Sequence, residues 1–321
     1  MKIERTLVAC LSVAAISQIS VKADDVNALM ANWNVITVKN AQINNEFEGR
    51  AYIGGNLTAD NQAAIGHSLS ATNISLAVAG NITANNYINV QNGSVVVGGT
   101  SAAHFNMNGG GTVSLGSPVP AAISPVSVLT SSSLYWSTLA GNSTITTNGA
   151  NQINFNTVAN SAGLAIVNVT GAQTFNAGLN GFNLNLGAGV TTVLVNINAG
   201  SINWNNGGFF GNFQTDFGRG NVVFNFYNAT NVYLGNQFEG YIVAPNATVT
   251  LGNNVDGGVM ASNLVANSEI HEPNRNSSAA SFYGTLPNAV AVTPAPEPAG
   301  LALLSTGAVL WAASRRRFGK N

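Results

Sequence analysis

Cysteine is nearly absent from this sequence. The chain has 321 residues and a single cysteine, Cys10, which lies in an N-terminal stretch that reads as a removable leader. Without residues 1–23 the chain has no cysteine, so it can form no disulfide bond even in an oxidising compartment. A disulfide-stapled scaffold is therefore excluded.

Charge is also scarce. Charged residues make up 7% of the chain, whereas hydrophobic residues make up 45%. Between Asp24 and Asn288 there are four basic and ten acidic residues, a net charge of −6 (4 − 10). Nucleic-acid binding needs a basic footprint, which this region lacks. Disordered chains are rich in charge and poor in apolar residues, so the opposite composition predicts a packed, all-β extracellular module with a surface of amides and hydroxyls.

The N-terminus reads as a secretory signal peptide over residues 1–23. Lys2 and Arg5 form a basic region, and an apolar stretch follows from Leu7 to Ile19. Small residues at Val21 and Ala23 then predict that signal peptidase cuts between Ala23 and Asp24. We therefore expect the chain to be exported.

The C-terminus carries a second pattern over residues 296–321. Pro296, Glu297 and Pro298 precede an uncharged apolar run from Ala299 to Ala313, and three arginines follow: Arg315, Arg316 and Arg317. The run is short for a spanning helix, which needs about 17–25 residues, but it can insert with its arginines at the cytoplasmic surface. This order resembles the PEP-type (PEP-CTERM) sorting signal of bacterial envelope proteins, although an ordinary hydrophobic anchor is the alternative. The resemblance implies that an exosortase removes the tail, so that a transmembrane anchor is transient.

Short β-like runs punctuated by glycine and asparagine fill the region between the two ends. Three of them share a pattern and contain Gly55, Gly80 and Gly99, which are 25 and then 19 residues apart. Spacings of about 20–50 residues are typical of solenoids. We expect these glycines to supply the positive φ of the corners. Later runs alternate apolar and polar residues, which places one side of each strand in a core and the other against solvent or an asparagine ladder.

Two segments read as helices. Residues 25–38 predict a short helix that leads into a strand, and residues 125–139 have apolar side chains at near-helical spacing. We predict a right-handed parallel β-solenoid (β-helix) of about ten coils over residues 24–288, with one flanking α-helix. A linker over residues 289–295 and a C-terminal hydrophobic helix would follow. Hairpin signals are missing on most connections, but an antiparallel sandwich stays the alternative.

Motifs in this region resemble the choice-of-anchor A domain. The residues that carry the resemblance are Glu48, Gly49, Gly54, Gly55, Asn56, Glu239, Gly240, Ala244, Pro245, Asn246, Gly257, Glu269 and His271. The resemblance extends from Asp24 to Leu286 and is strongest in the last third. That family is regarded as an adhesive β-helical domain with varied surface anchors. The resemblance therefore implies a place on the cell envelope or in the extracellular matrix of a biofilm, and says less about the ligand.

Ionisable side chains give little sign of catalysis. Glu269 and His271 would point to the same face of a strand, so they are either a metal-ligand pair or an ion pair near the domain end. Glu48 and Glu239 each stand between a phenylalanine and a glycine. Carboxylates in that position usually accept backbone hydrogen bonds. We therefore favour this structural role over the alternative, a glycosidase with paired catalytic carboxylates. No triad, phosphate loop or cofactor motif is apparent. We expect no enzyme activity, metal or cofactor.

Three functions compete. The first is a structural or adhesive envelope protein whose partner is an exopolysaccharide or another cell surface. The second is a carbohydrate- or ice-binding solenoid, and it rests on Thr58, Thr83, Thr248 and Thr250. The third is a polysaccharide lyase or hydrolase on the same fold. We expect the first, with binding spread over outward aromatic residues such as Tyr52, Tyr87 and Tyr233.

Overall fold

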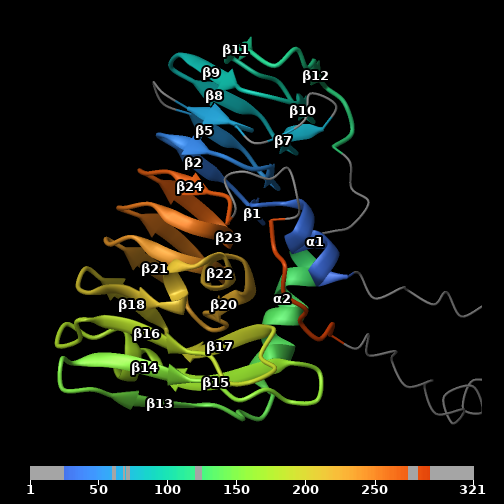
Figure 1. Ribbon diagram of the computed structural model, residues 1–321. Helices are drawn as coiled ribbons and strands as arrows, with labels where there is room; N and C mark the ends of the chain where they lie inside the picture. Colours follow the sequence, from blue (N-terminus) through green and yellow to red (C-terminus); the bar gives the residue numbers. More distant parts are fainter. Residues whose placement is uncertain are drawn as a thin grey trace, which may run out of the picture. The chain divides into compact units, whose positions relative to one another are not determined.

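Short strands stacked in parallel register make up most of the protein (Figure 1). The computed structural model describes residues 25–59, 63–67, 69, 73–119, 125–273 and 281–289. The signal peptide, with Ala23 and Asp24, and the sorting tail lie outside these residues and stay predictions. Within the described ranges, no helix has the length and apolar character needed to cross a membrane.

The strands form three sets, which we call faces A, B and C. Face A contains β1 (Val35–Thr37), β4 (Ala51–Ile53), β7 (Ile74–Val78), β10 (Ser94–Val97), β12 (Val113–Leu115), β15 (Leu164–Thr170), β17 (Thr192–Asn198) and β20 (Val222–Asn225). Face B contains β2 (Ala41–Ile43), β5 (Leu57–Ala59), β8 (Ile82–Ala84), β18 (Ser201–Trp204) and β21 (Asn231–Leu234). Face C contains β3 (Glu46–Phe47), β6 (Ala64–Ile65), β9 (Tyr87–Val90), β11 (His104–Met107), β13 (Thr144–Thr147), β14 (Gln152–Asn156), β16 (Gly181–Asn185), β19 (Gly208–Gly211) and β24 (Ile270–His271). The long strands β22 (Phe238–Leu251) and β23 (Val255–Ala266) run from face C through face A into face B.

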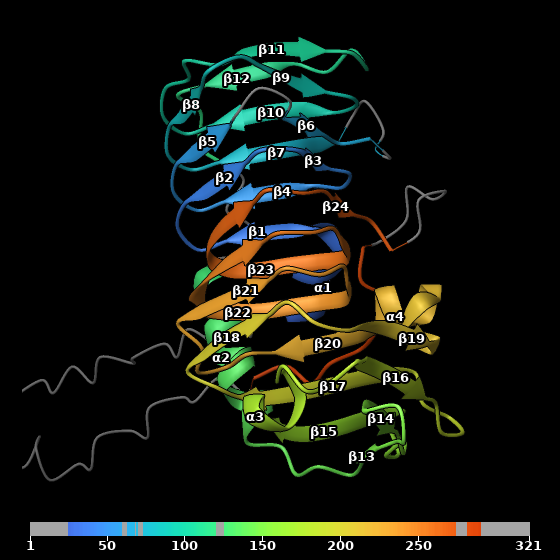
Figure 2. The ribbon, with the colours of Figure 1, turned by 90° about the vertical axis from the view of Figure 1, so that its left-hand side faces the viewer.

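The coils are not stacked in sequence order. The first strand, β1, pairs with β4 on one side and with β23 on the other, and β2 is likewise held between β5 and β23. From this middle position the chain rises to β12 at one end, and helix α2 (Pro125–Ser137) then runs beside the stack to the opposite end (Figures 1 and 2). The remaining coils climb from β13 back to β24. The first and last coils therefore meet at a joint inside the stack.

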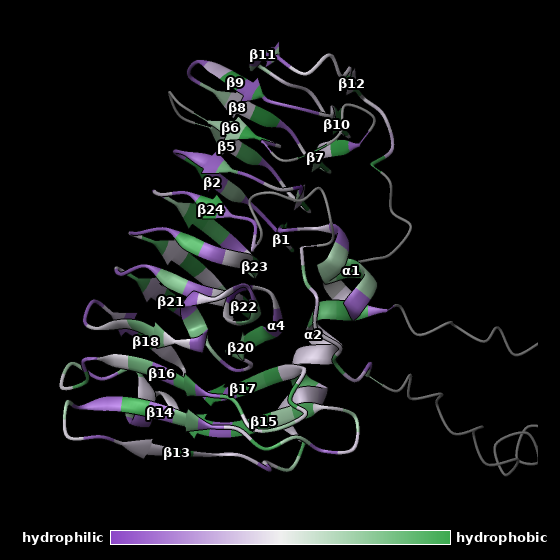
Figure 3. Ribbon diagram, in the orientation of Figure 1, coloured by the Kyte–Doolittle hydropathy of each residue, from purple (hydrophilic) through white to green (hydrophobic). Residues whose placement is uncertain are grey.

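Inward-pointing side chains form one continuous core. Hydrophobic and hydrophilic residues alternate along many of the strands (Figure 3). The coils from β1 to β12 are filled mainly with Val, Ile, Leu and Ala side chains, together with the ring of Phe47. The coils from β13 onward carry a cluster of aromatic rings, with Phe209 and Phe238 only 4.8 Å apart between centroids. Aromatic rings bury more area per side chain and pair edge to face, so they stabilise these coils strongly.

Face A is covered by α2 and by α1 (Val26–Asn32), whose N-terminus is capped by Asp25. Three asparagines in neighbouring strands of face A, Asn168, Asn196 and Asn225, form a ladder of side-chain hydrogen bonds of 2.9 Å. Each also donates to a backbone carbonyl in or just after α2, at Leu139, Trp136 and Ser133. The ladder therefore fixes where α2 lies on the sheet.

The fold agrees with the predicted architecture in most of the described residues. The predicted parallel solenoid is confirmed. In the described part of the chain only β13 and β14 pair antiparallel, so the alternative of an antiparallel sandwich is wrong. Both predicted helices are present, although α2 ends at Ser137. The right-handed sense of the coil stays a prediction.

Gly55, Gly80 and Gly99 are stacked as expected, because each backbone N–H reaches a carbonyl in the coil before it. The reason given for glycine there was wrong. None of the three has a positive φ. They are required because a Cβ atom would strike the corner of the neighbouring coil.

Candidate functional site

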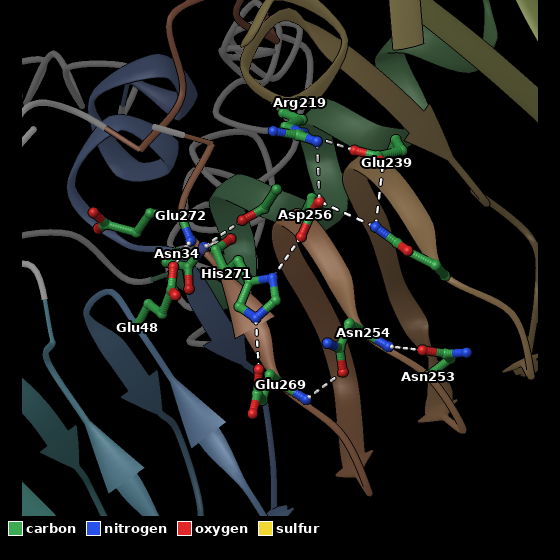
Figure 4. Close-up of polar contacts among 12 residues, drawn as sticks. Asn34, Glu48, Arg219, Glu239, Asn253, Asn254, Asp256, Glu269, His271 and Glu272 are labelled. Atoms are coloured by element: carbon green, nitrogen blue, oxygen red, sulfur yellow. Dashed lines mark hydrogen bonds and ion pairs between the residues drawn. The ribbon is translucent and has the colours of Figure 1, made fainter. Parts of the chain in front are cut away.

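Four ionisable residues occupy one register position in successive coils, at the corner where face C turns into face A. Glu239 pairs with Asp256 across β22 and β23, and Asp256 pairs with His271 in β24. Because Ile270 pairs with Phe47, the next residue in that position is Glu48. We call these four residues the polar column (Figure 4). Glu239, Asp256 and His271 are almost fully buried.

Ion pairs run along the column. The Nε of Arg219, on the short helix α4 (Asp216–Asn221), lies 2.9 Å from Oε2 of Glu239, and its Nη2 lies 3.4 Å from Oδ2 of Asp256. The opposite carboxylate oxygen of Asp256 contacts Nδ1 of His271 at 2.5 Å. Nε2 of His271 contacts Oε2 of Glu269 at 2.7 Å. Positive and negative groups therefore alternate from α4 to β24.

The column also connects the first coil to the last. Oε2 of Glu48 accepts a hydrogen bond of 3.0 Å from the backbone N–H of Glu272. The amide of Asn34, just before β1, donates to the carbonyl oxygens of Gly257 and His271. These contacts join residues more than 220 positions apart, at the joint between the two halves of the stack.

Burial changes the acidity of the column. Loss of solvent raises the pKa of Glu239 to about 7, although the hydrogen bond from Arg219 opposes this. Burial likewise raises the pKa of Glu272 to about 7, and the charge of Glu48 adds to the effect. For His271, burial disfavours the charged ring, but the hydrogen bonds to Asp256 and Glu269 outweigh it, so its pKa is raised. The two carboxylates on either side of the ring therefore favour its protonated form.

This geometry favours an ion-pair network over a metal site. Both ring nitrogens of His271 face carboxylate oxygens, so neither offers a lone pair to a metal. Among the residues that the structure describes, no group of three or more His, Cys, Asp or Glu side chains could hold a metal ion. The other two histidines are exposed, with His67 3.1 Å from Glu46 and His104 against the ring of Tyr87.

The predicted motif residues divide between two corners. At the corner between faces C and A lie Glu48, Gly49, Glu239, Gly240, Gly257 and His271, and Glu269 lies at the start of face C with its side chain against His271. At the corner between faces A and B lie Gly54, Gly55, Asn56, Ala244, Pro245 and Asn246. Gly240 and Gly257 have φ values of +108° and +148°, which explains why glycine follows the acidic residue in both coils.

Some interpretations of these residues need correction. Glu269 and His271 do contact each other, but they lie in the middle of the stack and not at a domain end, because β24 is held between β23 and β3. Glu48 accepts a backbone hydrogen bond as expected, whereas the partners of Glu239 are the side chains of Arg219 and Gln237.

The sequence reading missed Arg219 and Asp256. One signal for Asp256 was available, because it precedes a glycine just as Glu48 and Glu239 do.

The outward side of face B is a second candidate surface. Its central column, in strand order, is Asn203, Tyr233, Thr250, Val265, Gln42, Thr58 and Thr83. A parallel column, also uncharged, is Ser201, Asn231, Thr248, Asn263, Asn40, Asn56, Asn81 and Thr100. The predicted threonines therefore share one face.

Two of the three aromatic residues expected to point outward do so. Tyr87 and Tyr233 are exposed, on faces C and B. Tyr52 was predicted wrongly, because it lies on face A beneath α1, where its ring meets the edge of Trp33 at 5.7 Å.

These features define a parallel β-solenoid with one face covered by helices and an open face without charge. Residues 26–272 match the family described as "Putative Ice-binding-like adhesive domain". The chain belongs to this family, which indicates an adhesive protein at a surface or outside the cell. No curated protein and no solved structure matches the chain.

Proposed function

We propose that the chain is an exported bacterial adhesive protein that attaches to a polymer-coated surface through face B. The observation that carries this proposal is the pair of uncharged columns on that face, together with the family match over residues 26–272. Adjacent strands lie about 4.8 Å apart, so seven strands present a row of amides and hydroxyls roughly 30 Å long. Such a row makes many weak contacts with a hydroxyl-rich polymer.

Charge substitution on face B tests the proposal. We expect Thr58→Glu combined with Thr83→Glu to reduce retention of beads coated with the full chain on cellulose and dextran films, measured under shear flow. The matched control is Asn106→Glu combined with Thr144→Glu, two exposed positions on face C. Equal retention of wild type and the face B variant would remove face B as the adhesive surface.

Ice is the second candidate target, and the column that contains Thr58, Thr83 and Thr250 favours it. Val265 and Gln42 interrupt the threonines, which argues against a regular lattice match. Thermal hysteresis of the full chain that disappears in the face B variant would favour ice over a polymer.

Export and sorting belong to the same proposal. The choice-of-anchor A resemblance and the PEP-type tail support secretion after signal-peptidase cleavage near Asp24 and exosortase cleavage near Pro298. Mass spectrometry of the mature protein would measure both ends. Recovery of peptides containing Trp311 from the extracellular fraction would contradict removal of the tail.

We propose further that the chain is not an enzyme. Glu239, Asp256 and His271, the buried members of the polar column, each already contact a group of opposite charge. We expect Glu269→Gln and His271→Ala to change stability modestly and to leave retention on the films in place. A glycan-cleaving activity that either substitution removes without unfolding the chain would overturn this proposal.

A further inference from the structure

A cavity of about 300 Å³ opens on face C beside the polar column. Its lining comes from β19, from the short 3-10 helix η1 (Asn212–Gln214) and from the turn that leads into β22. Gly207 and Gly208 form part of its wall, so the backbone is open there. The cavity therefore joins segments that are about 30 residues apart in the sequence and one coil apart in the stack.

The lining combines an aromatic ring with amides and one carboxyl group. Phe210 contributes a ring that is 37% exposed, whereas Phe209 beside it is buried in the core. Gln214 and Gln237 contribute exposed amide side chains. Glu239 is 3% exposed, and its Oε1 accepts a hydrogen bond of 3.3 Å from Gln237.

Several ligand classes do not fit this chemistry. An anion would meet the acidic column, whose nearest cation, Arg219, already pairs with Glu239 and Asp256. A metal ion lacks a set of three ligands in the described part of the chain. A purely apolar ligand would bury several amides without hydrogen-bond partners, which is unfavourable. A neutral, hydroxyl-rich ring fits, because its C–H face can lie on an aromatic ring while its hydroxyls bind amides and a carboxyl group.

We propose that this cavity is a subsite for one neutral sugar residue of the surface polymer. The proposal rests on the adhesive function proposed above and names the chemical class of its ligand. A second cavity, of about 280 Å³, supports a polymer over a free monosaccharide, since it is lined by Asn203, Trp204, Asn205 and Asn206, which directly precede Gly207 in the chain. Because Asn206 lines the second cavity and Gly207 the first, the two lie next to each other along the chain, and one polysaccharide can reach both.

Saturation-transfer NMR on the full chain tests the subsite. The probes are the methyl glycosides of glucose, galactose and mannose, and N-acetylglucosamine, with glucuronate as the charged comparison. We expect at least one neutral probe to bind, and its apparent Kd to rise at least fivefold in Phe210→Ala and in Gln214→Ala. Tyr283→Ala is the matched control, because it removes a similarly exposed aromatic ring that lines neither cavity and lies outside the columns of face B.

Two results would overturn the subsite. They are the absence of a signal from every neutral probe, and a Kd that stays unchanged in both Phe210→Ala and Gln214→Ala while circular dichroism shows folded protein. Bead retention separates this failure from failure of the adhesive function. Retention that still depends on Thr58 and Thr83 would leave the adhesive proposal standing without the subsite.

Discussion

At the scale of single residues, the polar column and the ionisable side chains beside it are costly to bury. Glu239, Asp256, His271 and Glu272 are each less than a tenth exposed, and desolvation of ionised groups is unfavourable unless each has a partner. Arg219 and His271 supply two positive charges, while Glu48, Glu239, Asp256, Glu269 and Glu272 supply five acidic groups. Burial is the main reason why Glu239 and Glu272 bind protons more tightly than usual, and the neighbouring carboxylates of Asp256 and Glu48 add to the effect.

Stability should therefore fall as the pH rises. The pKa values of Glu239 and Glu272 are about 7 in the folded chain and 4.5 in the reference state, so the folded chain binds more protons between these values. The raised pKa of His271 acts in the same direction. We expect the free energy of unfolding to be several kcal/mol larger near pH 5 than near pH 8, on the order of 2 kcal/mol for each carboxyl group. Thermal melts of the full chain across this range would measure the loss.

Glu272→Gln tests the contribution of one buried carboxyl group beside the polar column. Glutamine resembles the protonated carboxyl group, so at pH 8 the variant should melt roughly 4–8 °C higher than the wild type. At pH 5, where Glu272 is itself protonated, the two proteins should have the same melting temperature. Glu46→Gln is the matched control, since Glu46 contacts the exposed His67 outside the column. Parallel pH profiles for Glu272→Gln and wild type would contradict this account.

At the scale of elements, the asparagine ladder holds helix α2 on face A. Asn225 is fully buried, donates to Asn196 and to the carbonyl of Ser133, and accepts from the Ser133 hydroxyl. Asn225→Ala should lower the free energy of unfolding by about 2–3 kcal/mol, because it leaves buried partners unsatisfied. Urea denaturation would measure the change. Asn203→Ala, at an exposed position, should change the free energy of unfolding by less than about 0.5 kcal/mol. Equal effects of the two variants would count against a role of the ladder in holding α2 on face A.

The corners between faces A and B depend on close backbone contact. A Cβ at Gly80 would meet the side-chain oxygen of Asn56 and lie 2.7 Å from the carbonyl oxygen of Gly55. Gly80→Ala should therefore lower the free energy of unfolding by about 2 kcal/mol, as judged by urea denaturation. Gly200→Ala provides the comparison, because nothing lies within 4 Å of a Cβ there. If both substitutions are tolerated equally, the corner is less tightly packed than the structure indicates.

At the scale of the whole molecule, local patterns predicted the coils but not their order. The alternation in Asn231–Leu234 and the spacing of Gly55, Gly80 and Gly99 depend on neighbours in the same or the next coil, so the sequence carries them. The pairing of β1 with β23 joins Val35 to Val259, and no local pattern encodes a contact over that distance. For the same reason, the sequence identified Glu269 and His271 as a pair but missed their connection through Asp256 to Arg219.

The coils are not stacked in sequence order, so the first and last coils meet at the joint between β1 and β23. A circular permutant tests how this joint affects folding. The ends of the described domain lie together, since the backbone N–H of Val26 donates to Asn288 at 3.0 Å and the amide of Asn27 to Leu286 at 2.9 Å. A short Gly/Ser linker from residue 289 to residue 25, with new termini between residues 116 and 125, would make the coils follow one another from β13 to β12. Fewer long-range contacts must then form before folding proceeds.

We expect this permutant to reach the same urea midpoint as the matching unpermuted domain, residues 25–289, and to refold at least tenfold faster in stopped-flow fluorescence. The midpoint should match because the joint between β1 and β23 keeps all its contacts, and only the connections between coils change. The rate should rise because the first and last coils no longer have to find each other across the whole chain. A permutant that folds more slowly, or not at all, would mean that the connection through residues 116–125 helps to build the stack.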